Sequence, residues 1–213
     1  RIYGAQQDNS TIRIAHRTDG FSIGMRDWEP TAGGESGHIA IDPTNNDIVY
    51  GGSYDGLLTM RNHATGEERN INAWPDNPMG HGAEGAKYRF QWNFPIFFSP
   101  HNPKKLYAAS QHLHVSYNGG ESWELVSPDL TRNDPSKLGP SGGPITKDNT
   151  AVEYYCTIFA VAESPYEKDL IMTGSDDGLL HLTRDGGKKW EKLSVTGMPE
   201  WTMVNSIEFD PFV

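Results

Sequence analysis

The chain has 213 residues, of which 36% are hydrophobic and 22% charged, and its 23 glycines suit a protein of many short strands and turns. Its 28 acidic residues exceed the 18 basic ones, which gives a formal net charge of −10. This charge argues against nucleic acid or an anionic membrane as a partner. The apolar runs are too short to cross a bilayer, so membrane insertion is not expected.

A signature of an apolar or aromatic residue, small residues and a turn occurs four times along the chain. The copies begin at positions 3, 50, 107 and 172, a spacing of roughly 50 to 65 residues, which is the size of a propeller blade. They are Tyr3–Asn9, Tyr50–Gly56, Tyr107–Leu113 and Met172–Gly178. The sequence therefore predicts a repeat protein.

An apolar strand that ends in a proline turn precedes three of these copies. The three strands are Ile39–Pro43, Phe97–Pro100 and Val161–Pro165, and a fourth such strand, Ile207–Pro211, stands near the end of the sequence. The chain also begins in mid-pattern at Arg1-Ile2-Tyr3. We therefore expect a segment of something larger, with a further blade opening after residue 203.

A second signature, Ser/Thr-x-Asn/Asp-x-Gly-x-x-Trp, closes two of the repeats. A short Asn or Asp side chain accepts hydrogen bonds within its own turn, glycine permits positive φ, and the tryptophan packs into a neighbouring sheet. These structural residues are Ser116, Asn118, Gly120, Trp123, Thr183, Asp185, Gly187 and Trp190. The motif indicates a fold rather than an activity.

The best-preserved repeat predicts strands over 157–163, 170–174, 179–183 and 190–193, and no long helical periodicity competes with them. The predicted fold class is all-β, a β-propeller segment of four-stranded antiparallel blades. We predict one partial propeller over 1–213: the end of a blade at 1–33, blades at 34–90, 91–150 and 151–203, and the first strand of the next blade at 204–213. This set of blades is not expected to close into a ring without further blades.

These residues resemble the Asp-box, or BNR, repeat of sialidases, xyloglucanase-type glycoside hydrolases and sortilin-type receptors. Four further segments resemble large exported bacterial proteins called sortilin-like or glycosyl-hydrolase-like after their propellers: Arg89–Pro95, Ser141–Thr146, Asp148–Cys156 and Pro199–Met203. The resemblance implies an extracellular, periplasmic or cell-surface location. It does not choose one activity, because the family mixes hydrolases, receptors and assembly factors.

Two members of this group are disfavoured by the sequence. A sialidase needs an arginine cluster and a Tyr nucleophile assisted by Glu, and no Arg-Ile-Pro element precedes the first blade. Sortilin-type receptors carry a cysteine-rich module, whereas Cys156 is the only cysteine here. Cys156 lies in an apolar run and is interpreted as a buried small hydrophobe.

The strand order predicts where a site would lie. The turns between second and third strands share one face with the connections between blades, and long connections commonly carry function. The connections over 75–93 and 128–155 are the longest. We expect ligand-binding residues there or nearby: Trp74, His81, Arg89, Trp92, Tyr154 and Trp201.

Carboxylates on that face could perform glycoside hydrolysis, which needs one acid and one base or nucleophile. Asp8, Asp55 and Asp177 recur at the same turn, where a turn-forming role is the simpler interpretation. Glu35 and Glu153 fall just ahead of inner strands, and Glu153 stands outside the repeat signature. Candidate catalytic residues are therefore Glu153 and Asp177, with a solvated loop residue as the alternative for Glu153.

The remaining aromatic and histidine residues carry open interpretations. Trp28, together with Trp74, Trp92 and Trp201, is assigned to the connections between blades, where an indole either stacks on a sugar or wedges between sheets. His112 and His114 have a spacing that could suit a metal, but no third ligand follows, so a surface pair is expected.

The sequence thus predicts a binding or interaction scaffold with a carbohydrate or protein ligand, no cofactor and no metal. Two alternatives remain: a xyloglucanase-like glycoside hydrolase that uses a pair of carboxylates, and a structural subunit of a larger assembly. In each case the expected partners include further blades or neighbouring chains.

Overall fold

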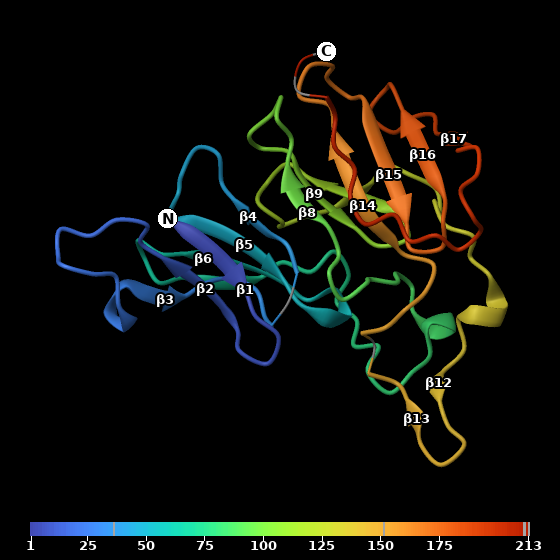
Figure 1. Ribbon diagram of the computed structural model, residues 1–213, viewed down its shortest axis with the longest axis horizontal. Helices are drawn as coiled ribbons and strands as arrows, with labels where there is room; N and C mark the ends of the chain where they lie inside the picture. Colours follow the sequence, from blue (N-terminus) through green and yellow to red (C-terminus); the bar gives the residue numbers. More distant parts are fainter. Residues whose placement is uncertain (36, 151, 211, 213) are drawn as a thin grey trace.

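A computed structural model describes residues 1–35, 37–150, 152–210 and 212. The chain is all-β, and its main sheets follow one another in chain order (Figure 1). Three of them are four-stranded antiparallel blades, and the N-terminal sheet has three strands. The predicted fold class, a β-propeller segment, is confirmed.

The strands of each sheet pair with their sequence neighbours. The first sheet contains β1 (Ile2–Ala5), β2 (Thr11–Ile14) and β3 (Trp28–Pro30). The second contains β4 (Ile39–Ile41), β5 (Ile48–Gly52), β6 (Leu58–Asn62) and β7 (Glu68–Asn70). The third contains β8 (Ile96–Phe98), β9 (Leu106–Ala109), β10 (Leu113–Ser116) and β11 (Glu124–Leu125). The fourth contains β14 (Ile158–Glu163), β15 (Ile171–Ser175), β16 (Leu180–Thr183) and β17 (Glu191–Leu193).

Short elements in the connections complete the fold. A small hairpin, which was not predicted, pairs β12 (Ser141–Gly142) with β13 (Lys147–Asp148). The described residues also form four single-turn 3-10 helices: η1 (Met25–Asp27), η2 (Tyr54–Gly56), η3 (Ala83–Gly85) and η4 (Pro135–Lys137). Among the described residues no helix is long and apolar enough to span a membrane.

A proline corner ends the first strand of the second, third and fourth sheets, and each corner contains the same kind of hydrogen bond. The side chain before each proline accepts from the backbone N–H two residues later: Asp42 from Thr44 at 2.7 Å, Ser99 from His101 at 3.2 Å and Ser164 from Tyr166 at 3.2 Å. This side-chain hydrogen bond takes the place of the strand's backbone hydrogen bonds at the point where the chain reverses.

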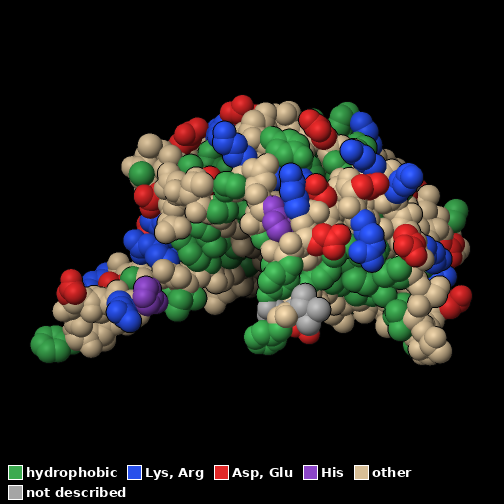
Figure 2. All heavy atoms as spheres, turned by 90° about the horizontal axis from the view of Figure 1, so that it is seen from above, with side chains coloured by type: hydrophobic (Ala, Val, Ile, Leu, Met, Phe, Trp, Pro, Cys, Tyr) green, Lys and Arg blue, Asp and Glu red, His purple; other side chains and the backbone are tan. Residues whose placement is uncertain are grey.

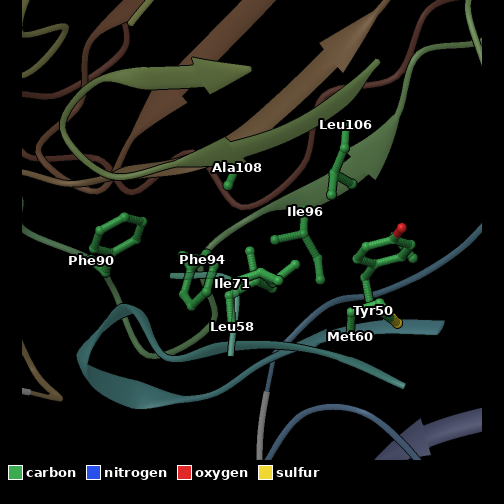
Figure 3. Packing of buried hydrophobic residues seen from close by; sticks show 10 residues of the cluster. Tyr50, Leu58, Met60, Ile71, Phe90, Phe94, Ile96, Leu106 and Ala108 are labelled. Atoms are coloured by element: carbon green, nitrogen blue, oxygen red, sulfur yellow. The ribbon is translucent and has the colours of Figure 1, made fainter. Parts of the chain in front are cut away.

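The hydrophobic core lies between the sheets. In β9, Leu106 and Ala108 join the cluster shared with the second sheet (Figure 3). Tyr107 and Ala109 join the cluster shared with the fourth sheet. Alternate residues of a strand point to opposite faces, so β9 is buried on both. Among the described residues, each of these two clusters is therefore shared by two consecutive sheets.

Each of the two Ser/Thr-x-Asn/Asp-x-Gly-x-x-Trp turns attaches its own blade to the preceding one. Trp123 Nε1 donates to the Ile71 carbonyl at 2.9 Å, and Trp190 Nε1 donates to the Val126 carbonyl at 3.0 Å. Both acceptors stand one residue after the outermost strand of the preceding sheet. We call these contacts the tryptophan seams.

Glycine is required at these seams by conformation and by space. Gly120 and Gly187 have φ of 89° and 103°, and a Cβ on either would collide with Ile71 or Val126. Their N–H groups donate to the hydroxyls that open the motif, Ser116 at 2.8 Å and Thr183 at 3.0 Å. The motif residues thus close their own turns and pack against the preceding sheet.

The seam between the first and second sheets uses histidine in place of tryptophan. His63 lies in the turn that corresponds to the two tryptophan turns, and its Nε2 is 2.8 Å from Thr31 Oγ1. Thr31 is one residue past β3, as Ile71 is past β7. The same seam therefore exists without the sequence motif.

The sheets together form an arch with a hollow on one side (Figure 2). The first strand of a further blade was predicted over 204–213, and the described residues in that range form no strand. The segment lies beside the fourth sheet, where Val204 N–H donates to the Ser175 carbonyl at 3.1 Å (Figure 1). The predicted boundaries between blades stay predictions.

The seams predict a specific loss of stability. Trp190→Phe keeps the ring but leaves the Val126 carbonyl without its donor, so urea unfolding should show a loss of about 1 to 2 kcal/mol. Trp74→Phe, at an exposed indole, is the matched control and should change stability by less than about 0.5 kcal/mol. Equal small effects of the two variants would show that the seam bond contributes nothing.

Candidate functional site

Two kinds of loop meet on one face of the arch, which we call the loop face. The first kind is the turn between second and third strands, and the second is the connection between sheets. A cavity of about 450 Å³, the main cleft, is lined by both kinds: Asp8 and Tyr54 from turns, and Glu35, Met79, Trp92 and Glu153 from connections. The structure thus brings together Trp92 and Glu153, which the sequence selected from different connections.

The main cleft combines an aromatic wall with acidic groups. Trp92 and Tyr54 supply ring surface, and Asp8, Glu35, Asp148 and Glu153 supply carboxyl groups. Glu35 Oε2 accepts from the Asp8 backbone N–H at 2.9 Å, which fixes the Glu35 carboxylate against the β1–β2 turn. The Glu153 side chain is exposed.

A second cavity of about 300 Å³, the side pocket, adjoins the main cleft, because both are lined by Asp148, Thr150 and Glu153. His81, Tyr154 and Lys137 line it as well. Two of the predicted ligand-binding residues, His81 and Tyr154, therefore lie in the side pocket.

Several side-chain polar atoms of the loop face are buried without a hydrogen-bond partner among the described residues: Asp55 Oδ1, Trp92 Nε1, Asn149 Oδ1 and Tyr154 Oη. A buried polar atom left unpaired costs about 1 to 3 kcal/mol, so such groups mark places where solvent or a ligand completes the bonding. Three of the four belong to residues that line the two cavities: Trp92, Asn149 and Tyr154.

Burial perturbs the acid–base chemistry of two of these groups. Burial raises the pKa of Asp55 to about 6. Burial, with added repulsion from the charges of Asp55 and Asp76, raises the pKa of Tyr154 to about 12. Tyr154 therefore stays a neutral hydrogen-bonding group across the physiological range.

Arg89 and Asp177 lie inside the loop network rather than at a cavity. Arg89 is 5% exposed, and its guanidinium donates to the Cys156 carbonyl at 3.1 Å and to Asp129 at 2.8 Å. Asp177 is fully buried and accepts from the Arg132 backbone N–H at 2.8 Å. Neither lines the main cleft or the side pocket, so neither is placed to meet a ligand there.

The other tryptophans take different places. Trp28 was assigned to a connection between blades, which is wrong: it begins β3 and is paired with Ile14. Trp74 is 42% exposed, with Lys87 Nζ 3.3 Å from its ring centroid. Trp201 packs edge-to-face on Tyr155 at 5.8 Å, beside the side pocket, which Tyr155 lines.

The predicted surface pair of histidines is wrong. His114 is 2% exposed, its Nε2 is 2.8 Å from Ser110 Oγ, and its ring stacks on Phe90 at 5.7 Å. Burial lowers the pKa of His114 to about 3.

Cys156 is fully buried as predicted, and burial raises the pKa of its thiol to about 12. In the described part of the chain no three His, Cys, Asp or Glu side chains converge as metal ligands.

Comparison with known proteins gives structural likeness only. No protein-family model and no curated protein matches the chain. The computationally designed Ika4 protein resembles it with a TM-score of 0.41 at 16% identity, over 81% of this chain and 78% of that one.

Two larger proteins also resemble it. YCF48 from Cyanidioschyzon merolae has a TM-score of 0.38 at 19% identity, over 73% of this chain and 35% of that one. The GH74 xyloglucanase from Xanthomonas campestris has a TM-score of 0.38 at 18% identity, over 84% of this chain and 34% of that one. The chain spans about a third of either protein. At these TM-scores none of the three bears on the ligand.

The raised pKa of Asp55 predicts a pH-dependent effect on stability. Between about pH 4 and pH 6 the folded state holds the Asp55 proton that the unfolded state releases, so stability falls as pH rises through this window. Asp55→Asn, which suits the φ of 64° at this position, should therefore add about 1 kcal/mol at pH 7.5, allowing for partial exposure, and nothing at pH 3.5.

Urea unfolding of both proteins at the two pH values measures this difference. Asp8→Asn is the control, because Asp8 has the same turn conformation, with φ of 59°, and is exposed. A gain from Asp55→Asn that is the same at both pH values would refute the assignment of the effect to ionisation.

Proposed function

We propose that the chain is a binding scaffold whose main cleft takes a carbohydrate. The observation that carries this proposal is the lining of that cleft: Trp92 and Tyr54 offer ring surface beside the carboxylates of Asp8, Glu35 and Glu153. A sugar presents an apolar ring face and a rim of hydroxyl groups. Aromatic rings pack on such a face, and carboxylates accept hydrogen bonds from such a rim.

The charge of the main cleft selects among carbohydrates. Its lining contains four carboxylates and no Lys or Arg among the described residues. An anionic sugar would be repelled there, whereas a neutral glycan would not. The proposed ligand class is therefore a neutral oligosaccharide, long enough to reach from the main cleft into the side pocket across Glu153.

Trp92 has a particular place in this proposal. Its indole lies in the lining of the main cleft, and its Nε1 is buried with no partner among the described residues. A hydroxyl group of the ligand is a suitable acceptor for that N–H. Ring packing and this hydrogen bond would then come from the same side chain.

A glycoside hydrolase is the second candidate, and one observation favours it. Glu35 and Glu153 come from different connections and line the same cleft. A hydrolase of this kind needs two carboxyl groups about 5 to 10 Å apart across the scissile bond. In this candidate Glu153 is paired with Glu35 and not with Asp177, since Asp177 is fully buried in the loop network.

We place this function outside the cytoplasm. The support is the sequence resemblance to exported bacterial propellers, together with a ligand class that is abundant on cell surfaces.

The binding proposal predicts affinity for neutral oligosaccharides. Isothermal titration with cello-oligosaccharides and xyloglucan oligosaccharides should give saturable binding, and sialyllactose, an anionic glycan, should give none. Trp92→Ala should weaken binding at least about tenfold, because both the ring contact and the indole N–H are lost. Trp28→Ala, at a half-exposed indole outside the cleft, is the control and should bind like the parent protein.

Two results would contradict the carbohydrate proposal. One is the lack of binding by every neutral glycan tested. The other is unchanged binding by a correctly folded Trp92→Ala protein, with folding checked by near-UV circular dichroism.

The hydrolase candidate is tested with the same glycans. If the chain hydrolyses xyloglucan, Glu153→Gln should lower the rate by about 100-fold or more and leave binding largely intact, because the amide keeps the shape but cannot transfer the proton. Release of reducing ends measures the rate. Turnover that survives Glu153→Gln unchanged removes Glu153 from the mechanism, and a parent protein without turnover leaves the scaffold as the function.

A further inference from the structure

The side pocket has two aromatic rings at its margin, Tyr155 and Trp201, which we call the aromatic corner. Tyr155 lines the pocket and is 51% exposed. Trp201 is half-buried and packs edge-to-face on Tyr155, with ring centroids 5.8 Å apart. Lys137, which also lines the pocket, has its Nζ 5.7 Å from the Trp201 ring centroid. Both rings therefore keep surface that a ligand of the side pocket can contact.

The backbone of Trp201 is held in an unusual conformation. Its φ is 61°, in the left-handed region that a bulky side chain rarely adopts and that persists only where the surroundings enforce it. The turn between β15 and β16 packs directly against it, because a Cβ on Gly178 would lie 3.1 Å from the Trp201 backbone nitrogen. The turn thus fixes where the Trp201 side chain leaves the chain.

Arg132 fixes the ring of Trp201 from the other connection. Its guanidinium carbon lies 5.4 Å from the Trp201 ring centroid, within the range of a cation–π contact. Asp177 holds Arg132 in turn, since its carbonyl accepts from Arg132 Nε at 2.7 Å and its carboxylate from the Arg132 backbone N–H at 2.8 Å. A ring that is fixed in advance loses little freedom when a ligand packs on it.

The main cleft, the side pocket and the aromatic corner adjoin one another in that order. The main cleft and the side pocket share Asp148, Thr150 and Glu153 as lining residues. Tyr155 belongs to both the side pocket and the aromatic corner, and it does not line the main cleft. The side pocket therefore connects the cleft that Trp92 lines with the ring of Trp201.

The charges change sign along this row. The main cleft has four carboxylates and no Lys or Arg among the described residues, whereas Arg132 and Lys137 lie against the aromatic corner. A charged chain would be repelled at one end of the row, and a neutral chain at neither. The row as a whole therefore suits a neutral chain with repeated apolar faces, such as a linear glycan.

We infer that the aromatic corner is a second sugar-binding platform, and that the ligand is a linear neutral glycan of at least three sugar units. One ring packs on Trp92 in the main cleft and another on Trp201. The main cleft, of about 450 Å³, and the side pocket, of about 300 Å³, are each large enough for a sugar ring, so a chain that reaches both tryptophans also fills the pocket between them. The inference rests on the proposed function and adds a chain length to it.

Binding of a short and a long glycan tests the second platform. Isothermal titration of the parent protein should show that cellohexaose binds at least about tenfold more tightly than cellobiose, because only the longer chain reaches the aromatic corner. Trp201→Ala should weaken cellohexaose binding at least about tenfold and change cellobiose binding by less than about twofold, because the disaccharide stays in the main cleft. Trp92→Ala should weaken the binding of both.

Three further variants complete the test. Trp74→Ala is the matched control, because Trp74 is also a part-exposed indole with a cation at its ring, Lys87 Nζ, and lines neither cavity. It should bind both glycans like the parent protein. Trp201→Phe keeps a ring on the platform and should keep most of the preference for cellohexaose. Tyr155→Ala removes the exposed half of the aromatic corner and tests the platform if Trp201→Ala does not fold.

The outcomes separate this inference from the proposed function. Equal affinity of the parent protein for the two glycans would overturn the inference alone, and so would unchanged cellohexaose binding by a correctly folded Trp201→Ala or Tyr155→Ala protein. A parent protein that binds neither glycan would contradict the proposed function and the inference together. Near-UV circular dichroism of each variant shows whether the fold is retained.

Discussion

The structure depends on one recurring contact, the seam between consecutive sheets. A side chain from the turn before the outermost strand reaches back to the residue that follows the previous sheet, through Trp123, Trp190 or His63. Two of the three boundaries joined in this way, between the second and third and between the third and fourth sheets, also contain a shared hydrophobic cluster. The seam and the cluster together hold consecutive sheets side by side, and the main cleft is lined by the turns and connections of sheets held in this way.

Much of the fold was predictable because its signals are local. Alternating strands, proline corners and the Ser/Thr-x-Asn/Asp-x-Gly-x-x-Trp turns are set by residues within a few positions of one another, and the strands of the fourth sheet lie within a residue or two of their predicted bounds. The His63 seam was not predictable, because histidine in a turn carries no sign of its contact with Thr31. His114 was misjudged because Phe90, which covers it, is remote in sequence.

The candidate site was predictable only in part, for the same reason. Length and composition singled out the connections over 75–93 and 128–155, and Trp92, His81, Tyr154 and Glu153 line cavities there. In the sequence, Arg89 and Asp177 look equally suited to bind a ligand. In the structure, however, Arg89 is hydrogen-bonded to Cys156 and Asp129, and Asp177 is hydrogen-bonded to Arg132. Only the folded chain distinguishes a polar residue that ties loops together from one that is free to bind.

The blades stabilise one another, and β9 reports on this best because its two faces belong to two different clusters. Residue-resolved amide hydrogen exchange measures the free energy of opening of each strand. The amides of β9, from Leu106 to Ala109, should open with a free energy at least as large as those of β5 and β15, since β9 is released only when both interfaces separate. Opening of β9 at a lower free energy than β5 or β15 would contradict this mutual stabilisation of the blades.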